Sequence, residues 1–261
     1  MMKKILITSL IAIMLTANVS ADTDGVNSLS KKSKPVKDCF ESLNRATFSL
    51  NQGLDKLIFK PVAKGYRNLP SSVRTGTSNA LNNLSSLITV PNNILQGEFK
   101  TAGINTGRFV VNTTVGILGV FNAAERMGFS NYEKEDYGQT LGKWGVGPGC
   151  YVVLPVLGPS TIRDTAGSFI NIIGGDPYYN ASTHGNNEYL SDTVFMTTKA
   201  ISGIDFRAKN LESIDNLKKN SMDFYASVKS LYLQDRQQKI KNSNPSIEIM
   251  YEGDWEEIET Q

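Results

Sequence analysis

Apolar residues recur at steps of three and four along the first half of the chain, which is the spacing of a single helix face. This pattern predicts a helix over residues 38–60, and Pro61 is expected to end it. A second helix with an asparagine-rich polar face is expected over residues 71–84, and Pro91 is expected to interrupt the segment that follows. The pattern over residues 97–124 predicts a longer helix.

Two uncharged stretches make the centre of the chain its most apolar part. Residues 109–124 hold no charged side chain, yet they are fewer than the about 20 residues that span a bilayer and too apolar to face water on all sides. Residues 144–162 are also uncharged, but their prolines and glycines exclude a continuous helix. Around residues 151–157 the sequence predicts a short extended segment or hairpin between turns.

The second half of the chain again favours helices. A helical piece is expected over residues 161–173, a loop containing His184 over residues 174–187, and another helix over residues 189–201. A long amphipathic helix is predicted over residues 205–241, because apolar side chains line one of its faces. These side chains are Leu211, Ile214, Leu217, Phe224, Val228 and Leu231. The expected fold class is therefore mainly α, a bundle of amphipathic helices with one short extended or hairpin segment.

Composition and charge narrow the classes of function. The chain has 261 residues, of which 40% are hydrophobic, and this excludes wholesale disorder. Lysine and arginine number 27 against 25 aspartate and glutamate residues, so there is no broad positive surface and no nucleic-acid partner is expected. One histidine and two distant cysteines do not form a ligand cluster, so neither a metal nor another cofactor is expected.

The start of the chain has the pattern of a signal peptide over residues 1–21. Two lysines precede an apolar run over residues 5–17, and small residues precede a cleavage point after Ala21. The alternative is an uncleaved membrane anchor, for which the apolar run is short. Because Asp22 and not a cysteine follows the cut, a lipid-attached N-terminus is not encoded in the usual way.

Three segments follow in the expected mature chain. Residues 22–37 form a flexible polar tether, residues 38–241 a single helical domain, and residues 242–261 an acidic disordered tail. The domain holds the two cysteines of the chain, Cys39 and Cys150. In an oxidising compartment an even number of cysteines permits one disulfide, and a pair of buried free thiols is the alternative.

The chain contains no complete catalytic motif. Residues 138–144 look like a phosphate loop, but three residues instead of four separate the glycines, and Trp144 stands where a magnesium-binding hydroxyl belongs. A Ser-His-Asp triad would require His184, and no Gly-x-Ser-x-Gly elbow is present. Arg163 and Asp164 border an uncharged run, where they form either a structural ion pair or a polar lining. The protein is therefore expected not to be an enzyme.

Many short motifs along residues 38–236 are similar, in the same order, to those of the VacJ/MlaA family. They are DCFESLNR at 38–45, KPVA at 60–63, PNNILQG at 91–97, GRF at 107–109, NTTVGI at 112–117, DYGQTLG at 136–142, YVVLP at 151–155, GPS at 158–160 with Arg163 and Asp164, and Tyr232 with Gln234 and Arg236. The resemblance is carried by the number and order of these motifs, since none is specific alone.

The resemblance implies an outer-membrane phospholipid transport protein of Gram-negative bacteria, exported to the periplasmic leaflet. Such proteins remove mislocalised phospholipid from the outer leaflet and pass it to a soluble periplasmic carrier. The family architecture is a ring of amphipathic helices around an amphipathic channel, often beside a trimeric porin. The implied partners are therefore phospholipid, the outer membrane, a trimeric porin and a periplasmic lipid-carrier protein. Family members usually carry a lipid-modified cysteine at the cleavage site, so anchoring of this chain is left open.

The resemblance also suggests roles for individual residues. The polar channel candidates are Asn112, Thr113, Gln139, Arg163 and Asp164. Candidates for lipid contact, which an ordinary core would also use, are Phe109, Val110, Val111, Ile117, Leu118, Val120 and Phe121. Candidates for close packing or hinges are Gly116, Gly119, Gly142 and Gly145. Cys39 and Cys150 fall where many relatives have proline, and their joint occurrence motivates the hypothesis that they are bonded.

Two other functions stay open at this point. A structural or virulence-associated envelope protein would use the same apolar centre to dock onto another protein and would move no lipid. A periplasmic lipase would need His184 for its chemistry, whereas a transport protein would work unchanged with alanine there.

Overall fold

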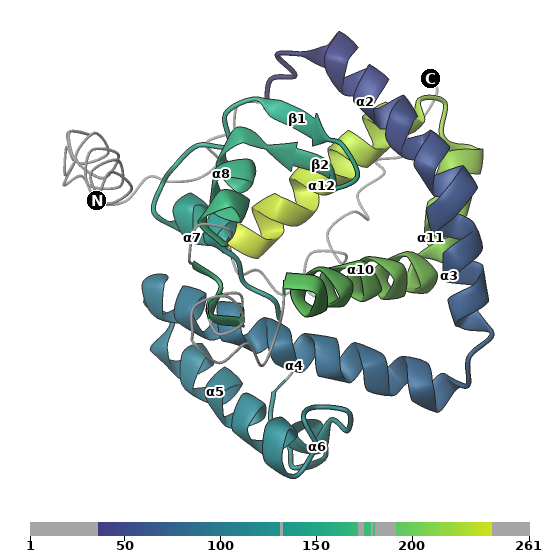
Figure 1. Cartoon of the computed structure of the whole chain (residues 1–261). Coiled ribbons are helices and arrows are strands. Elements are labelled where there is room, and N and C mark those ends of the chain that lie inside the picture. The colour runs from purple at the N-terminus through teal and green to yellow at the C-terminus, as the bar shows by residue number, and fades with distance from the viewer. Residues whose placement is uncertain (1–35, 131–132, 172–174, 179, 181–191, 242–261) are drawn as a thin grey trace, which may run out of the picture. The chain divides into compact units, whose positions relative to one another are not determined.

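The computed structural model describes residues 36–130, 133–171, 175–178, 180 and 192–241 (Figure 1). Within these residues the protein is mainly helical and has a two-stranded β-hairpin, which confirms the expected fold class. The expected signal peptide and acidic tail, nearly all of the expected tether, and His184 lie outside the described residues.

The first helical run continues past Pro61. It consists of α2 (Glu41–Leu54), a π-helical turn η1 (Asp55–Phe59) and α3 (Lys60–Arg67). The expectation that Pro61 ends this helix is therefore wrong. Proline is tolerated in the first turn of a helix, and the π turn before it already pairs the Lys60 N–H with the Asp55 carbonyl, so the backbone loses little bonding.

The next helix, α4 (Ser71–Leu95), runs through Pro91 without a break, so the expected interruption is also wrong. Proline removes one backbone donor from the helix. Beside it the Asn92 side chain donates to the Ile88 carbonyl at 2.8 Å, which adds a bond to the turn that the proline weakens. The helix therefore continues unbroken over 25 residues, and its buried face runs along most of this length.

The helix expected over residues 97–124 is shorter than predicted. It is α5 (Phe99–Thr114), and a loop over residues 115–121 separates it from the single turn α6 (Ala123–Arg126). In this loop Ile117 and Leu118 have φ angles of 52° and 55°, which the right-handed helix excludes. Figure 1 shows α4 and α5 side by side, with α6 beyond the end of α5.

The predicted extended segment is confirmed as an antiparallel hairpin. It follows α7 (Tyr137–Lys143) and consists of β1 (Tyr151–Leu154) and β2 (Gly158–Thr161), after which α8 (Ile162–Ile170) begins. Tyr151 pairs with Thr161, and Leu154 with Gly158. The side chain of Thr161 accepts a hydrogen bond from the backbone N–H of Asp164 and so caps α8.

The long helix predicted over residues 205–241 is wrong, because this stretch is divided among three helices. They are α10 (Asp192–Lys209), α11 (Leu211–Asn220) and α12 (Phe224–Lys241). The second break has a local cause: the Asp223 carboxylate accepts from the Ala226 N–H at 3.1 Å, as a residue that starts a helix does. Of the predicted apolar face, Leu211 is buried, whereas Leu231 is exposed.

Helix α2 closes the open edge of β1 with two asparagines. Asn44 donates to the Tyr151 carbonyl at 3.0 Å and accepts from the Val153 N–H at 2.9 Å. Two turns later, Asn51 makes the same pair of bonds with the Leu154 carbonyl and the Val156 N–H. The amide side chains thus satisfy backbone groups that a third strand would otherwise bond.

A disulfide fastens the same junction. Cys39, just before α2, is bonded to Cys150, just before β1, and the two Cα atoms are 5.6 Å apart. This confirms the disulfide hypothesis over the free-thiol alternative. Beneath the junction, Phe48, Tyr151, Val153 and Tyr225 form an apolar cluster between α2, the hairpin and α12.

Removing this disulfide should destabilise the domain. The bond closes a loop of 111 residues, so replacing both Cys39 and Cys150 with serine should lower the free energy of unfolding by about 4 kcal/mol. Urea unfolding of the oxidised wild type and the double variant measures this difference. Wild type that has been reduced should unfold like the variant, and equal midpoints for all three samples would contradict the prediction.

Candidate functional site

One face of α4 is polar and nevertheless buried. Asn83, Ser86, Thr89, Asn92 and Asn93 recur at steps of three and four, and each is at most 5% exposed. The expected asparagine-rich polar face is thus present and extends along the helix, but it is turned inward. Buried polar side chains need hydrogen-bond partners, so the helix packed against this face has to supply them.

Helix α5 supplies several of these partners from its own polar face. Asn105 donates to the Asn93 side chain at 2.9 Å, and Asn83 donates to the Thr113 hydroxyl at 2.9 Å. At the far end, Asn112 accepts from the Ala124 N–H at 2.9 Å. The two helices therefore meet through amide and hydroxyl groups, where most helix pairs meet through apolar side chains.

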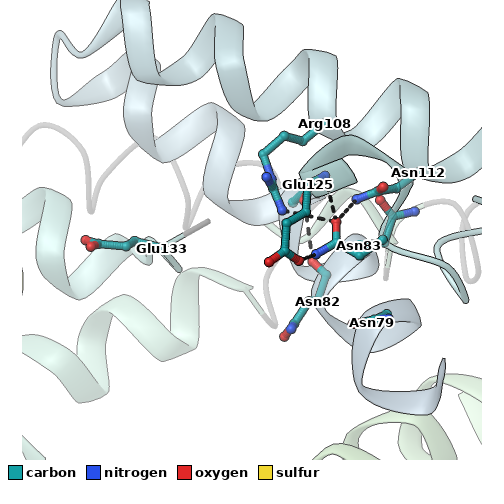
Figure 2. Close-up of a pocket in the computed structure, with 9 residues that line it drawn as sticks. Asn79, Asn82, Asn83, Arg108, Asn112, Glu125 and Glu133 are labelled. Carbon is teal, nitrogen blue, oxygen red and sulfur yellow. Dashed lines mark hydrogen bonds between the residues drawn. The ribbon is translucent and has the colours of Figure 1, made fainter. Parts of the chain in front are cut away.

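A cavity of about 380 Å³ opens at the end of this polar contact, and we call it the polar pocket (Figure 2). Residues of α4, α5, α6 and the segment after α6 line it. They are Asn79, Asn82, Asn83, Ser86, Arg108, Asn112, Asn122, Glu125 and Glu133. Figure 2 shows Arg108, Asn112 and Glu125 grouped on one side and Glu133 apart from them.

Two further hollows lie along α4, and each shares lining residues with the one before it. A middle hollow of about 640 Å³ shares Asn79, Asn122 and Glu125 with the polar pocket. An apolar hollow of about 460 Å³ shares Val120 with the middle hollow. Its other lining residues include Val73, Ala80, Leu81, Leu84 and Ile201. The lining thus changes from amides and charges at one end to aliphatic side chains at the other.

The 115–121 loop borders these hollows and turns apolar side chains to the outside. Ile117 is 62% exposed, Leu118 is 70% exposed, and Val115 and Phe121 are more than half exposed. Among the candidates for lipid contact, Val110 and Val120 are exposed as well, whereas Phe109 and Val111 are half-buried.

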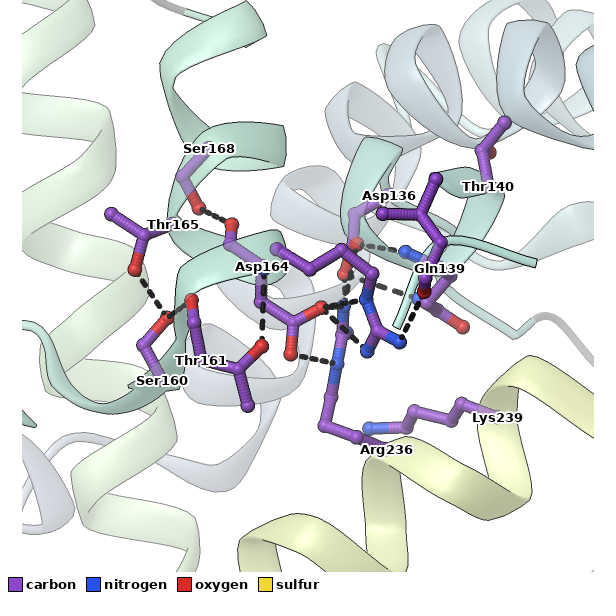
Figure 3. A network of polar contacts seen from close by, with 12 residues as sticks. Asp136, Gln139, Thr140, Ser160, Thr161, Asp164, Thr165, Ser168, Arg236 and Lys239 are labelled. Atoms are coloured by element: carbon purple, nitrogen blue, oxygen red, sulfur yellow. Dashed lines mark hydrogen bonds and ion pairs between the residues drawn. The ribbon is translucent and has the colours of Figure 1, made fainter. Parts of the chain in front are cut away.

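A second polar cluster joins α7, α8 and α12 (Figure 3). Arg236 bonds Asp136 at 2.6 Å and Asp164 at 2.8 Å, and Arg163 bonds Asp164 at 2.9 Å. The Tyr232 hydroxyl donates to Asp164 at 2.7 Å. Arg163 and Asp164 therefore form the structural ion pair that the sequence left as one alternative.

The charges in this cluster stabilise one another. Burial alone would raise the pKa of Asp136, but the bonds and positive charge of Arg236 overcome it and hold that pKa at about 2. Burial acts in the same direction on Asp164, and Arg236 again lowers the pKa of the carboxyl. Both carboxylates therefore stay ionised at neutral pH, and the cluster ties three helices together.

The channel candidates divide between the two sites. Asn112 lines the polar pocket, and Thr113 accepts a bond from the pocket residue Asn83. Arg163 and Asp164 belong to the charged cluster, as does Gln139, whose backbone and side chain both bond Asp136.

Three of the four glycine candidates are positions of close packing. A Cβ atom on Gly116 would lie 2.5 Å from the Asn112 carbonyl oxygen, and one on Gly119 would lie 2.8 Å from the Cγ atom of Asn83. At Gly142 it would meet Ile240 at 2.7 Å. Gly145 has open space around it, but its φ of +87° ends α7 in a conformation that favours glycine.

The residues that dominate the polar pocket are Asn79, Asn82, Asn83 and Arg108. The sequence placed the three asparagines on an expected polar helix face and Arg108 in a family motif, but it marked none of the four as a site residue. The asparagines recur on one helix face, and Arg108 is an isolated charge in an otherwise uncharged stretch of α5. Either pattern could have marked them. Among the residues that the structure describes, no three histidine, cysteine, aspartate or glutamate side chains gather where they could hold a metal ion.

Comparison with known proteins shows to which family the chain belongs. The family model described as MlaA lipoprotein matches residues 36–239. The chain belongs to the MlaA lipoprotein family. That match covers the whole described part apart from its last two residues, so it includes the polar pocket, the 115–121 loop and the charged cluster.

Relatives in the MlaA family support the assignment over most of the chain. The intermembrane phospholipid transport system lipoprotein MlaA of Haemophilus influenzae is 27% identical over 92% of this chain and 91% of its own length. The protein of the same description from Escherichia coli is 33% identical over 76% of each chain. A protein of Rickettsia bellii described as uncharacterized is 33% identical over 80% of this chain and 78% of its own.

A solved structure has the same fold. It is described as the structural basis for maintenance of bacterial outer membrane lipid asymmetry, and it superposes with a TM-score of 0.66 at 32% identity. The comparison covers 78% of this chain and 99% of the solved chain. The relatives described as MlaA are transport lipoproteins, and this chain is similar to them in sequence over most of its length.

Glu135 is a buried carboxyl group near the polar face of α4. It accepts a bond from Gln96 at 2.8 Å, and its backbone N–H donates to the Thr89 hydroxyl. Burial raises the pKa of Glu135 to about 7, and the negative charge of Asp136 adds to the effect. The folded state therefore binds this proton more tightly than the unfolded chain does.

Replacing Glu135 with glutamine should change the pH dependence of stability. The protonated Glu135 side chain adds its full contribution to the free energy of unfolding below pH 4.5. This contribution is lost as the pH rises towards 7. Glu135→Gln should therefore be more stable than wild type at pH 8 by about 3 kcal/mol, and the difference should vanish near pH 4.5. Urea unfolding at the two pH values measures it, with Asp235→Asn, at an exposed carboxylate of α12, as the control. A difference that is the same at both pH values would disprove this account.

Proposed function

We propose that this protein transports phospholipid at the outer membrane, removing mislocalised phospholipid from the outer leaflet and passing it to a periplasmic carrier. The main support is the inverted distribution of polarity. Among the described residues, nine hydrophobic side chains are buried against twenty polar or charged ones, and thirty large hydrophobic side chains are exposed. Such a surface is costly in water, at about 25 cal/mol for each Å² of apolar area, but suits contact with acyl chains.

The three adjoining hollows fit the two parts of a phospholipid. A head group would occupy the polar pocket, among the amide side chains, while the acyl chains follow the apolar hollow along α4. Each part then moves through surroundings of its own polarity, so no step exposes a charge to hydrocarbon. The transport is passive, and its direction comes from the partner that accepts the lipid.

We place the protein in the periplasmic leaflet of the outer membrane, as a ring of amphipathic helices beside a trimeric porin. None of the described helices is long and apolar enough to cross a bilayer. Contact with the leaflet would come from the exposed apolar side chains of the 115–121 loop and of α2 with the η1 turn that follows it, which include Ile117, Leu118, Leu43, Leu50 and Leu57. Family membership, in a group of transport lipoproteins, supports this placement.

Loss of the protein should raise the phospholipid content of the outer leaflet. In cells that lack it, a phospholipase added outside should release more phospholipid product than in wild-type cells, and restoring the gene should reverse the change. The purified mature protein should also carry co-extracted phospholipid. Absence of both effects would favour an envelope protein that docks without moving lipid.

The 115–121 loop should contribute to membrane binding. Replacing both Ile117 and Leu118 with asparagine removes their apolar surface, and asparagine tolerates the positive φ of both positions, so the fold should persist. The fraction of protein that sediments with outer membranes should fall severalfold. The fully exposed Met222→Asn, between α11 and α12, is the matched control. Equal sedimentation of the double variant and the control would contradict membrane contact by this loop.

A further inference from the structure

Arg108 differs from the other buried arginines of the described part in having no acidic partner. Arg163 bonds Asp164, and Arg207 bonds Asp55 and Asp215. Arg108 is only 5% exposed, yet its bonds go to the backbone carbonyls of Phe129 and Ser130 and to the amide oxygen of Asn122. These neutral acceptors orient the guanidinium, and none of the three bonds joins it directly to a carboxylate of the described residues.

The arrangement leaves Arg108 able to bind an anion. A guanidinium has five N–H donors, and the three bonds of Arg108 come from Nη1 and Nη2. A buried charge without a counter-ion is costly, so a bound anion in the polar pocket would relieve that cost. Phosphate is the anion whose geometry a guanidinium matches best, since it can accept two parallel N–H bonds.

Asn122 places a negative charge beside this positive one. Its amide oxygen accepts from Arg108 at 3.2 Å, while its amide nitrogen donates to the Glu125 carboxylate at 2.5 Å. One asparagine thus spans Arg108 inside the pocket and Glu125 at its exposed rim. With Glu133 also in the lining, the pocket has one positive and two negative side chains. It therefore suits a zwitterion better than a group with a net negative charge.

We propose that the polar pocket binds a phosphoethanolamine head group, with its phosphate on Arg108 and its ammonium on Glu125. The protein would then prefer phosphatidylethanolamine to phosphatidylglycerol, whose head group has no ammonium to meet Glu125. This inference rests on the proposed transport function, since it names the lipid class that the pocket selects.

The test measures how much lipid is bound and of which class. Purified protein is equilibrated with detergent micelles that hold equal amounts of the two phospholipids, and the bound lipid is quantified by phosphorus content and mass spectrometry. Wild type should bind phosphatidylethanolamine in several-fold excess. Arg108→Gln should bind about tenfold less phospholipid in total, because a charge-assisted pair is lost. Glu125→Gln should keep total binding within about twofold and lose the preference between classes.

Two exposed controls account for a general change of charge. Lys219→Gln removes an exposed cation of α11, and Asp235→Asn removes a carboxylate of α12, and both should bind lipid as wild type does. Arg108 also holds backbone carbonyls, so its variant could unfold. In that case the exposed Glu125→Gln decides alone, and a retained preference for phosphatidylethanolamine would overturn the proposal.

Soluble competitors separate head-group recognition from simple phosphate binding. Glycerophosphoethanolamine should displace bound phospholipid at lower concentration than inorganic phosphate does. Equal displacement by inorganic phosphate would overturn the ethanolamine assignment. Folded Arg108→Gln that binds lipid like wild type would overturn the site while leaving the transport function intact. If wild type binds no phospholipid, the transport function itself fails.

Discussion

The hydrogen-bonded contact between α4 and α5 is the interaction on which the rest of the structure depends. Asparagine, serine and threonine side chains occupy positions where helix pairs usually place leucine or valine, and Asn93 and Asn83 reach partners on α5 directly. Because buried amides are costly when unpaired, this contact fixes the alignment of the two helices closely. It also leaves apolar side chains of both helices, such as Val73 and Val110, on the outside, where the proposed function requires them.

The polar pocket and the charged cluster differ in whether their charged side chains are bonded to one another. The cluster around Arg236 is closed, since its guanidinium and the carboxylates of Asp136 and Asp164 satisfy one another. The polar pocket is open, because the charge of Arg108 meets only neutral oxygens. A fully satisfied network holds helices in place, whereas an unsatisfied one can receive a ligand.

The helices and the hairpin could be predicted from the sequence, whereas their limits and the site could not. Periodicity shows which segments are amphipathic, but Pro91 has no effect on the continuity of α4, and Ile117 and Leu118 take up a conformation that their types disfavour. The sequence pattern of the asparagine-rich face is the same whether that face meets water or another polar helix, so the pattern does not predict its burial. Arg108 was missed because its distinguishing feature, a buried guanidinium bonded to neutral oxygens instead of to a carboxylate, exists only in three dimensions.

The asparagine pairs that join α2 to β1 determine how the hairpin can interact with other proteins. Asn44 and Asn51 occupy the outward backbone groups of β1 at two successive places, so that side of the hairpin is unavailable for strand addition by another chain. The disulfide makes this closure permanent in an oxidising environment. Any displacement of the hairpin must therefore carry α2 with it, so the two elements move as one rigid unit.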